Sequence, residues 1–403
     1  MQSSSLLSPY RAFLKIPDVP AMILMGWLSR SPIAMNALGM LLFLRNELGN
    51  FQAAGQAVGA FFVSMAVAAP VVGRVIDRHG PRWPLIVDGV MHPLFMAAIL
   101  WAGTQHASQS VLLLLAVGAG LFAPPVTILT RTTWRHRFDD EHNRKMAYSI
   151  DSVMIELNFT FGPLFVAALI PLIGPVHTFA CVIGVGIAAV LTFVASPILK
   201  YWKTEPAGER HLLGPLTSGK LVGLFGLSFG LTLSFGLLEV GYPAYATFID
   251  WVAFGGVLLA LNALGSGVGG FVYGAIHSAR PLEQQFTLAL AIMGIPLFLH
   301  WPFDAHVAFA LLAFVSGLMI APALTAQTLL VTRIAPPKYA TEAFTWSSTF
   351  IVSGLGLGMA LGGALTEQLH PKAPFVAGGA LVAGMAVLSL LLPRAAPRSS
   401  APT

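Results

Sequence analysis

Long apolar runs follow one another along almost the whole chain, and short polar or charged stretches separate them. Most runs hold about 20 residues, the length that a helix needs to cross the hydrocarbon layer of a bilayer. The pattern predicts an all-α integral membrane protein, because a helix satisfies its own backbone hydrogen bonds in lipid. Twelve transmembrane segments are expected at residues 20–44, 52–73, 83–103, 110–129, 146–170, 177–199, 221–245, 252–276, 286–301, 306–332, 341–365 and 373–392.

The cations orient these segments. With twelve spans and the N-terminus inside, 19 of the 22 Lys and Arg residues fall on the cytoplasmic side, because only Arg45 and Lys372 fall outside and Arg30 falls within a span. This positive-inside bias predicts that both termini are cytoplasmic. The first apolar run is too long for the core of a secretory signal, so we expect it to be retained as a helix.

Composition excludes several classes of protein. The chain is 56% hydrophobic and 10% charged, whereas a soluble domain carries about 25% charged residues. The net charge of +5 marks membrane orientation rather than a nucleic-acid partner, which we do not expect. The single Cys181 excludes a disulfide framework, and we expect no metal and no cofactor. Because no phosphate-binding glycine motif or soluble domain is evident, we do not expect an enzyme or an ATP-driven pump.

An internal repeat divides the chain. Gly162 in the fifth segment corresponds to Gly358 in the eleventh at an offset of 196, and Gly120 in the fourth corresponds to Gly317 in the tenth at an offset of 197. Two parallel repeats of six helices are therefore expected. The predicted boundaries are an N-terminal bundle over residues 1–199, a cytoplasmic linker over 200–216 and a C-terminal bundle over 217–403.

The charged stretch from Val72 to Arg82 is predicted to form a tight cytoplasmic loop between the second and third segments. Its spacing of Gly73, Asp77, Arg78, Gly80 and Arg82 resembles the loop between helices 2 and 3 of the major facilitator superfamily, with Pro81 as the one departure. The chain is similar to that family over essentially its full length. The resemblance implies twelve helices in two pseudo-symmetric bundles and a latch between them that involves Asp77 and Arg78. The alternative is that these residues only maintain topology.

Glu342 begins the eleventh segment from the cytoplasm and completes this candidate gate motif. A carboxylate in the first turn stabilises the positive end of a helix dipole, and it is also placed to face Arg78 or Arg82. Two other patterns of the family's drug–proton antiporters are incomplete. The fourth segment lacks their arginine, and Gly162-Pro163 in the fifth is not followed by their further glycines.

Ionisable residues within spans are costly and mark candidate functional sites. Arg30 and Glu156 each lie about ten residues into a helix, near the bilayer midplane, so we predict that they form an ion pair. In one interpretation Glu156 binds and releases a proton with help from Arg30; in the other the pair only fixes helix packing. Asp151 and Asp88 are expected nearer the cytoplasmic face, as further proton-coupling candidates or as partners of helix ends.

Four more polar residues are candidates for a substrate cavity: Asn36, Glu239, Asn262 and Gln327. Core packing explains each of them equally well. Together these features predict a proton-coupled secondary transporter that works by alternating access and exports a small amphipathic molecule, such as a drug or metabolite, by proton antiport. The alternatives are a proton-coupled symporter for nutrient uptake and a non-transporting receptor with the same fold. The expected partners are a small-molecule substrate, protons and the lipid bilayer. We expect a monomer in the bacterial cytoplasmic (inner) membrane.

Overall fold

The computed structural model describes residues 8–202, 214–276, 278, 280–336 and 340–391, and over these residues all regular elements are helices. The α-helices are α1 (Ser8–Leu14), α2 (Val19–Leu48), α3 (Phe51–His79), α4 (Arg82–Thr104), α5 (Gln109–Leu121), α6 (Val126–Arg137), α7 (Glu141–Ala195), α8 (Gly219–Phe248), α9 (Val252–Ala275), α10 (Leu282–Leu299), α11 (His306–Gly317), α12 (Ile320–Ile334), α13 (Ala340–Gln368) and α14 (Ala373–Ser389). Two 3-10 helices, η1 (Pro197–Tyr201) and η2 (Gly214–Thr217), flank the predicted linker, most of which lies outside the described residues.

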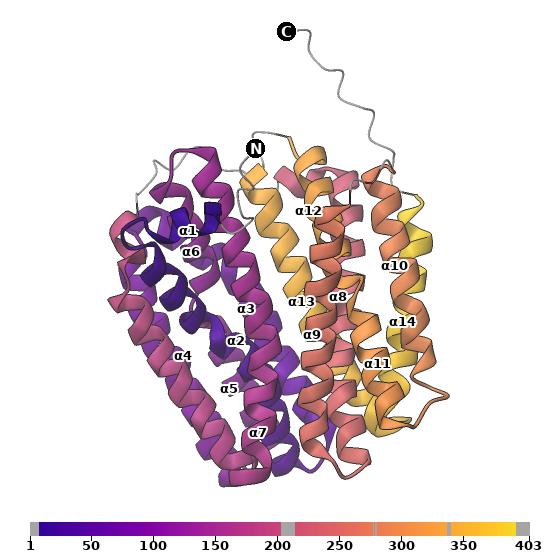
Figure 1. Cartoon of the computed structure of the whole chain (residues 1–403). Coiled ribbons are helices and arrows are strands. Elements are labelled where there is room, and N and C mark those ends of the chain that lie inside the picture. Colours follow the sequence, from indigo (N-terminus) through magenta and orange to yellow (C-terminus); the bar gives the residue numbers. More distant parts are fainter. Residues whose placement is uncertain (1–7, 203–213, 277, 279, 337–339, 392–403) are drawn as a thin grey trace.

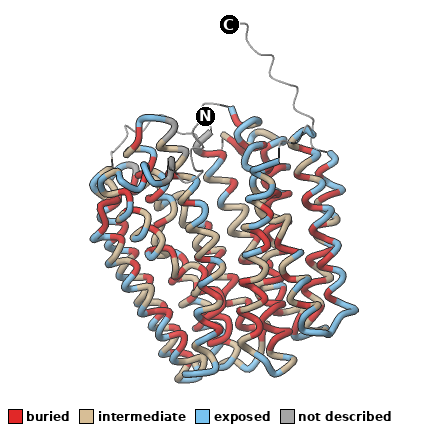
Figure 2. The backbone as a smooth tube through the Cα atoms, in the orientation of Figure 1, coloured by how far each residue is buried: buried red, intermediate tan, exposed pale blue. Residues whose placement is uncertain are grey.

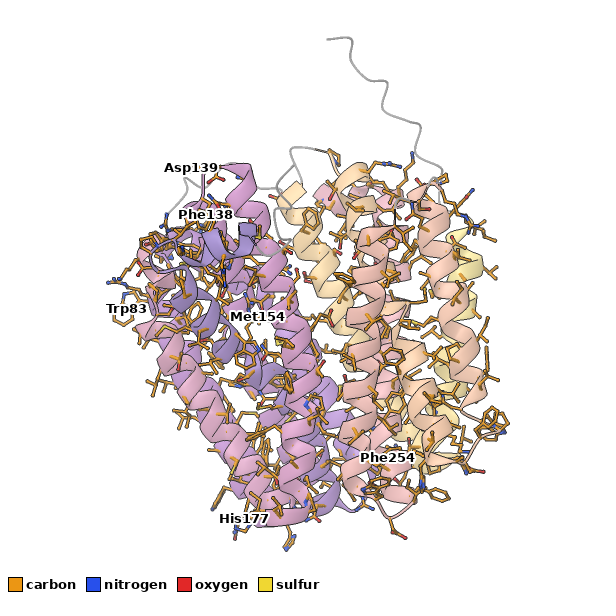
Figure 3. All side chains as sticks on the ribbon, in the orientation of Figure 1. Trp83, Phe138, Asp139, Met154, His177 and Phe254 are labelled. Atoms are coloured by element: carbon orange, nitrogen blue, oxygen red, sulfur yellow. The ribbon has the colours of Figure 1, made fainter. Side chains whose placement is uncertain are left out.

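Helices α1–α7 form one group and α8–α14 a second group beside it (Figure 1). Helix α1 and the last turn of α14 lie at the same end of the molecule, which we call the terminal end. The turns between α2 and α3 and between α10 and α11 lie at the other end, which we call the distal end, and so does His177 of α7 (Figures 1 and 3).

Nine helical segments within the described residues are long and apolar enough to cross a membrane. One of them covers most of α7, a 55-residue helix that is interrupted at Gly174, where φ is 74°. This left-handed backbone favours glycine and divides α7 into two rods. The fifth and sixth predicted segments are therefore separate rods within one continuous element.

Two exposed tryptophans mark the ends of α4. Trp83 and Trp101 are 70% and 69% exposed, and their separation of 18 residues corresponds to about 27 Å along a helix. That length matches the hydrocarbon thickness of a bilayer, and tryptophan is enriched at both membrane interfaces. Trp83 projects away from the bundle (Figure 3), so this face of α4 is suited to contact lipid.

The same helix contacts recur in the two groups. Helix α2 packs on α7 as α8 packs on α13, and α3 packs on α5 as α9 packs on α11. A Cβ added at Gly120 would lie 2.1 Å from the carbonyl oxygen of Phe61, and one added at Gly317 would lie 2.0 Å from that of Asn262. The glycines that align in the sequence therefore allow equivalent close approaches of two helices.

Two of the predicted spans are broken. The segment expected at 110–129 consists of α5 and α6, separated at Phe122–Pro125, and the one expected at 306–332 consists of α11 and α12, separated at Leu318–Met319. Pro124 and Pro125 cannot donate a backbone hydrogen bond, which accounts for the first break. The breaks lie at corresponding positions of the two groups, in keeping with the repeat.

The predicted tight loop over 72–82 is also wrong in extent. Helix α3 continues to His79, and only Gly80 and Pro81 connect it to α4. Gly80 has a φ of 78°, and its N–H donates to the carbonyl of Ile76 at 2.8 Å. Arg78 and His79 lie in the last turn of α3, where cations are favourable to the helix dipole.

Candidate functional site

Arg30 of α2 forms a buried ion pair with Asp151 of α7. Nη1 of Arg30 lies 2.7 Å from Oδ1 of Asp151, and each side chain is 3% exposed. The predicted pairing of Arg30 with Glu156 is therefore wrong. Helix α7 begins at Glu141 rather than at Met146, so Asp151 lies ten residues from its start and Arg30 eleven residues from the start of α2. Both are about 15 Å from the terminal end, which brings them level.

Asp151 has a second cationic partner in α6. Nε of Arg131 lies 3.2 Å from Oδ2 of Asp151, and the Arg131 side chain is 53% exposed. The break before α6 lets this short helix present Arg131 to α7. In the sequence Arg131 counts only as one of the cytoplasmic cations, although its place directly after an apolar run was a signal of a deeper position.

A narrow cleft adjoins this ionic cluster between α2, α6 and α7. Its walls are Met22, Ile23, Gly26, Arg30, Thr130, Trp134, Ile150, Asp151 and Met154, and it has room for about one water molecule. Nε and Nη2 of Arg30 are buried and have no hydrogen-bond partner among the described residues. Figure 3 labels Met154, which lies about midway between the two ends of the molecule.

Glu156 lies five residues beyond Asp151 on α7 and is only partly buried. A separation of five residues turns a side chain by about 140° around the helix, away from the Arg30 cluster. Among the described residues its carboxylate has no ion-pair or hydrogen-bond partner, whereas its backbone carbonyl accepts from Thr160 at 3.0 Å. Ser149 and Ser152, on the same face of α7, are exposed.

Asp88 and His92 lie one turn apart in α4 and are 4% and 6% exposed. Nδ1 of His92 is 2.8 Å from the carbonyl of Ala119 in α5, which fixes the ring against that helix. Oδ2 of Asp88 has no hydrogen-bond partner among the described residues. The structure therefore does not join Asp88 to the Arg30 cluster, and Asp88 remains a separate buried carboxyl.

Two of the four cavity candidates form hydrogen bonds within the second group. Asn262 of α9 donates to the carbonyl of Ala313 and to Oγ of Ser316, both at 3.0 Å, and Tyr242 of α8 also contacts Ser316. Gln327 of α12 donates to Oγ of Ser347 in α13 at 2.8 Å and is 1% exposed. These bonds hold helices of the second group together. Asn36 of α2 is buried and Glu239 of α8 is partly buried.

Two helix pairs make most of the contacts between the groups and form a seam near the distal end. In the α3–α13 pair a Cβ added at Gly59 would lie 2.4 Å from the carbonyl oxygen of Gly356, and one at Gly363 would lie 2.2 Å from that of Phe51. In the α7–α9 pair a Cβ at Gly256 would lie 2.6 Å from the carbonyl oxygen of Pro163. Figure 2 shows buried segments gathered where the groups meet near the distal end.

The seam loosens toward the terminal end. Val67 and Val71 of α3 are 60% and 61% exposed, and Phe344 in the terminal part of α13 is 40% exposed. Thr349 still reaches the carbonyl of Ala66, at 3.5 Å. The two groups therefore contact each other closely at the distal end and separate at the terminal end.

A comparison with known families decides the identity of this architecture. The family described as the Major Facilitator Superfamily matches residues 22–303 and 252–403. The chain belongs to this superfamily. It is a multi-pass membrane protein of a transporter family, and the resemblance carried by the charged stretch is confirmed.

The relatives of this superfamily member agree with the assignment. The chain is 27% identical over 398 residues to an uncharacterized MFS-type transporter, y4rN, of Sinorhizobium fredii (strain NBRC 101917 / NGR234), covering 94% of this chain and 96% of that protein. The nucleoside transporter NupG has a similar structure, with a TM-score of 0.74 at 10% identity over 93% of this chain and 98% of that one. A bacterial homologue of the human lysosomal transporter Spinster, in an inward-facing and occupied conformation, has a TM-score of 0.69 at 14% identity, covering 95% and 97%.

The superfamily's charged motif is found at the terminal end, where α3 meets α4. Gly73 lies within α3, Arg78 and Arg82 are exposed, and the side chain of Asp77 lies outside the described residues. Glu342 is 7% exposed in the first turn of α13. Among the described residues no ion pair joins Glu342 to Arg78 or Arg82, so the expected contact across the halves is absent from this conformation.

Proposed function

We propose that this superfamily member is a proton-coupled secondary transporter that exports a small amphipathic molecule by proton antiport. In this proposal twelve membrane-spanning helices form two six-helix bundles, residues 1–199 and 217–403, joined by the linker. The protein acts as a monomer in the bacterial cytoplasmic membrane with both termini in the cytoplasm. The observation that carries the proposal is the seam, which is closed at the distal end and open at the terminal end.

A transporter that works by alternating access needs contacts between its halves that form and break during each cycle. The α3–α13 and α7–α9 contacts suit this role, because backbone meets backbone at glycines and no ion pair crosses them among the described residues. Opening of the α3–α13 contact also breaks hydrogen bonds, among them the one from the Phe51 N–H to the Glu367 carboxylate at 3.1 Å. With the terminal end in the cytoplasm, the structure corresponds to an inward-facing state. In the opposite state the distal contacts open, and the charged motif approaches Glu342.

Glu156 is the proton-coupling residue in this proposal. Asp151 is engaged by Arg30 and Arg131, whereas Glu156, on the same helix, has no cationic partner among the described residues and is only partly buried. A carboxyl group without a fixed partner gains or loses its proton without breaking an ion pair. Motion of α7 against α9 would change its access to water and so couple its protonation to conformation.

Proton movement in proteoliposomes that contain a trapped pH dye tests this function. Native protein, Glu156→Gln and the control Glu47→Gln, which removes a carboxylate at the distal end of α2, are challenged with drugs, sugars, nucleosides, peptides and organic acids. We expect one class of compound to drive protons opposite to itself, and we expect Glu156→Gln alone to abolish this flux. Flux in the same direction would indicate a symporter. The absence of any compound-driven flux would favour the receptor alternative.

A further inference from the structure

The Arg30 cluster carries an unbalanced charge. Two guanidinium groups, those of Arg30 and Arg131, share the single carboxylate of Asp151, so the three side chains sum to +1. Among the described residues that line the adjoining cleft, Asp151 is the one carboxylate. An uncompensated positive charge next to a largely buried cluster favours the approach of an anion, because attraction is stronger where water is excluded.

Arg30 also has hydrogen-bonding capacity that the protein does not use. Its side chain is 3% exposed, and only Nη1 reaches Asp151. Nε and Nη2 are buried without a partner among the described residues. Buried donors are normally satisfied, and a guanidinium presents its N–H groups in a fixed fork that matches a carboxylate. Arg30 thus leaves one donor edge unused beside the cleft that it lines.

The walls of the cleft restrict the chemistry of a ligand. Apart from the ionic residues and Thr130, the lining is formed by Met22, Ile23, Trp134, Ile150 and Met154, together with Gly26. The space holds about one water molecule, so in this conformation it admits the oxygen end of a ligand and excludes its body. Arg131, which is 53% exposed, would meet the same charged group from the more open side.

We propose that this cleft binds the carboxylate of a small amphipathic organic anion, with one carboxylate oxygen on the free donor edge of Arg30 and the charge shared with Arg131. The apolar walls border the end that enters, and the carbon skeleton stays outside the cleft in this conformation. An amide of the same shape accepts weaker hydrogen bonds, and an amine is repelled by the net positive charge. As a transport substrate this anion rests on the function proposed above, whereas the site itself does not.

Binding to the full chain in nanodiscs tests the site. The probes are hexanoate, phenylacetate and 4-phenylbutyrate, each compared with its primary amide and with the amine of equal length by calorimetry at constant ionic strength. We expect at least one carboxylate to bind about tenfold more tightly than its amide, because charge-assisted hydrogen bonds are the stronger ones. Equal affinity of carboxylate and amide in every set, or no carboxylate binding at millimolar concentration, would overturn the proposal.

Substitutions locate the preference. Arg131→Gln removes the surplus charge from a half-exposed position, so the protein is expected to fold. Its affinity for each carboxylate should then lie within about twofold of its affinity for the matching amide. Lys220→Gln makes the same charge change on an exposed residue of α8, and this variant should retain the preference for carboxylates. Arg131→Glu makes the cluster net negative and should favour the amines. Persistence of the carboxylate preference in both Arg131 variants would place the anion elsewhere.

The outcome separates the site from the transport function. If carboxylates bind through Arg131 and no proton flux accompanies any compound, the proposed transport function fails and the site stands. If neutral or cationic compounds drive proton flux and carboxylates neither bind nor compete, the site fails and the transport function stands.

Discussion

Nη1 of Arg30 lies 2.7 Å from Oδ1 of Asp151, and this contact joins α2 to the long helix α7. Each residue is 3% exposed. Burial makes the pair a strong constraint on helix position, because a charge left alone in this environment is costly.

Loss of one partner should therefore be worse than loss of both. We expect Asp151→Asn to destabilise the protein by about 3–5 kcal/mol, because it leaves Arg30 buried and unpaired. The double variant Arg30→Met with Asp151→Asn should recover much of that loss. Thermal unfolding in detergent measures both effects. Losses that simply add in the double variant would show that the pair does not act as a unit.

Contact between α7 and α9 should control closure of the distal end. Gly256→Ala places a methyl group 2.5 Å from Cβ of Ala167, whereas Gly267→Ala in the same helix meets nothing within 4 Å. We expect the first variant to weaken the closed distal end by about 1–3 kcal/mol and the second to leave it unchanged.

Spin labels on Leu172→Cys and Phe248→Cys report this closure, in a chain where Cys181→Ser removes the native thiol. Leu172 and Phe248 are 76% and 60% exposed at the distal end. The distance between the labels should lengthen in Gly256→Ala and stay at the native value in Gly267→Ala. An identical distance distribution in all three proteins would argue against glycine contact as the determinant of closure.

Lys372 should hold the turn between α10 and α11. Its Nζ is within hydrogen-bond distance of the carbonyls of Trp301 (3.2 Å) and Phe303 (2.7 Å) and of the Asp304 carboxylate, and its side chain is 5% exposed. Lys372→Met should cost about 1–3 kcal/mol, because three bonds to a charged group are lost. Asp304→Asn should cost far less, because both carbonyl contacts remain. Thermal unfolding of the two variants measures this difference.

The same contact gives a dependence on pH. The hydrogen bond and charge of Lys372 lower the pKa of Asp304 below its usual value of 3.8. A carboxyl whose pKa is lower in the folded state stabilises the protein above its unfolded pKa, and this contribution is lost as the pH falls through the folded pKa. Native protein should therefore lose more stability than Asp304→Asn between pH 5 and pH 3. Parallel pH profiles for the two proteins would show that the carboxylate contributes nothing.

The charged motif should approach Glu342 only when the terminal end closes. A disulfide between Arg78→Cys and Glu342→Cys, with Cys181→Ser, should form slowly in the native background and faster with Gly256→Ala, which opens the distal end. The control pair is Gln56→Cys and Gln109→Cys, because these two side chains are hydrogen-bonded at 2.6 Å within the first group. The control should cross-link equally in both backgrounds. Equal rates for the motif pair would contradict coupling between the two ends.

Hydropathy locates the long helices, because the bilayer demands long apolar runs, but it does not fix the number of spans. Nine helical segments of the described residues qualify, and neither α2 nor α14 is among them. Hydropathy was less informative about helix ends. Helix α3 ends at His79 rather than at the predicted Gly73, and α7 begins at Glu141 rather than at Met146. The turns that the prediction missed at these two helix ends are polar. That error of five residues at the start of α7 placed Asp151 too near the surface and assigned Arg30 to Glu156.

The sequence pattern does not predict which residues the polar side chains contact in the folded protein. Asn262 and Gln327 are polar residues within apolar segments, as expected of residues that line a cavity, yet their amides bind neighbouring helices. Arg131 is a cation at the end of an apolar run, as expected of a residue that sets topology, yet it binds Asp151. Which side of a helix faces a neighbour depends on its rotation, and no periodic signal fixes rotation where all faces are apolar.

The glycine contacts at the seam act as a mechanical stop. The carbonyls of Gly356 and Phe51 approach α3 and α13 so closely that even a methyl group would not fit. A side chain can relieve a close contact by changing rotamer, whereas the main chain of a helix cannot. The angle at which the two halves come to rest is thus set by the main chain, and it should remain the same whichever molecule occupies the space between them.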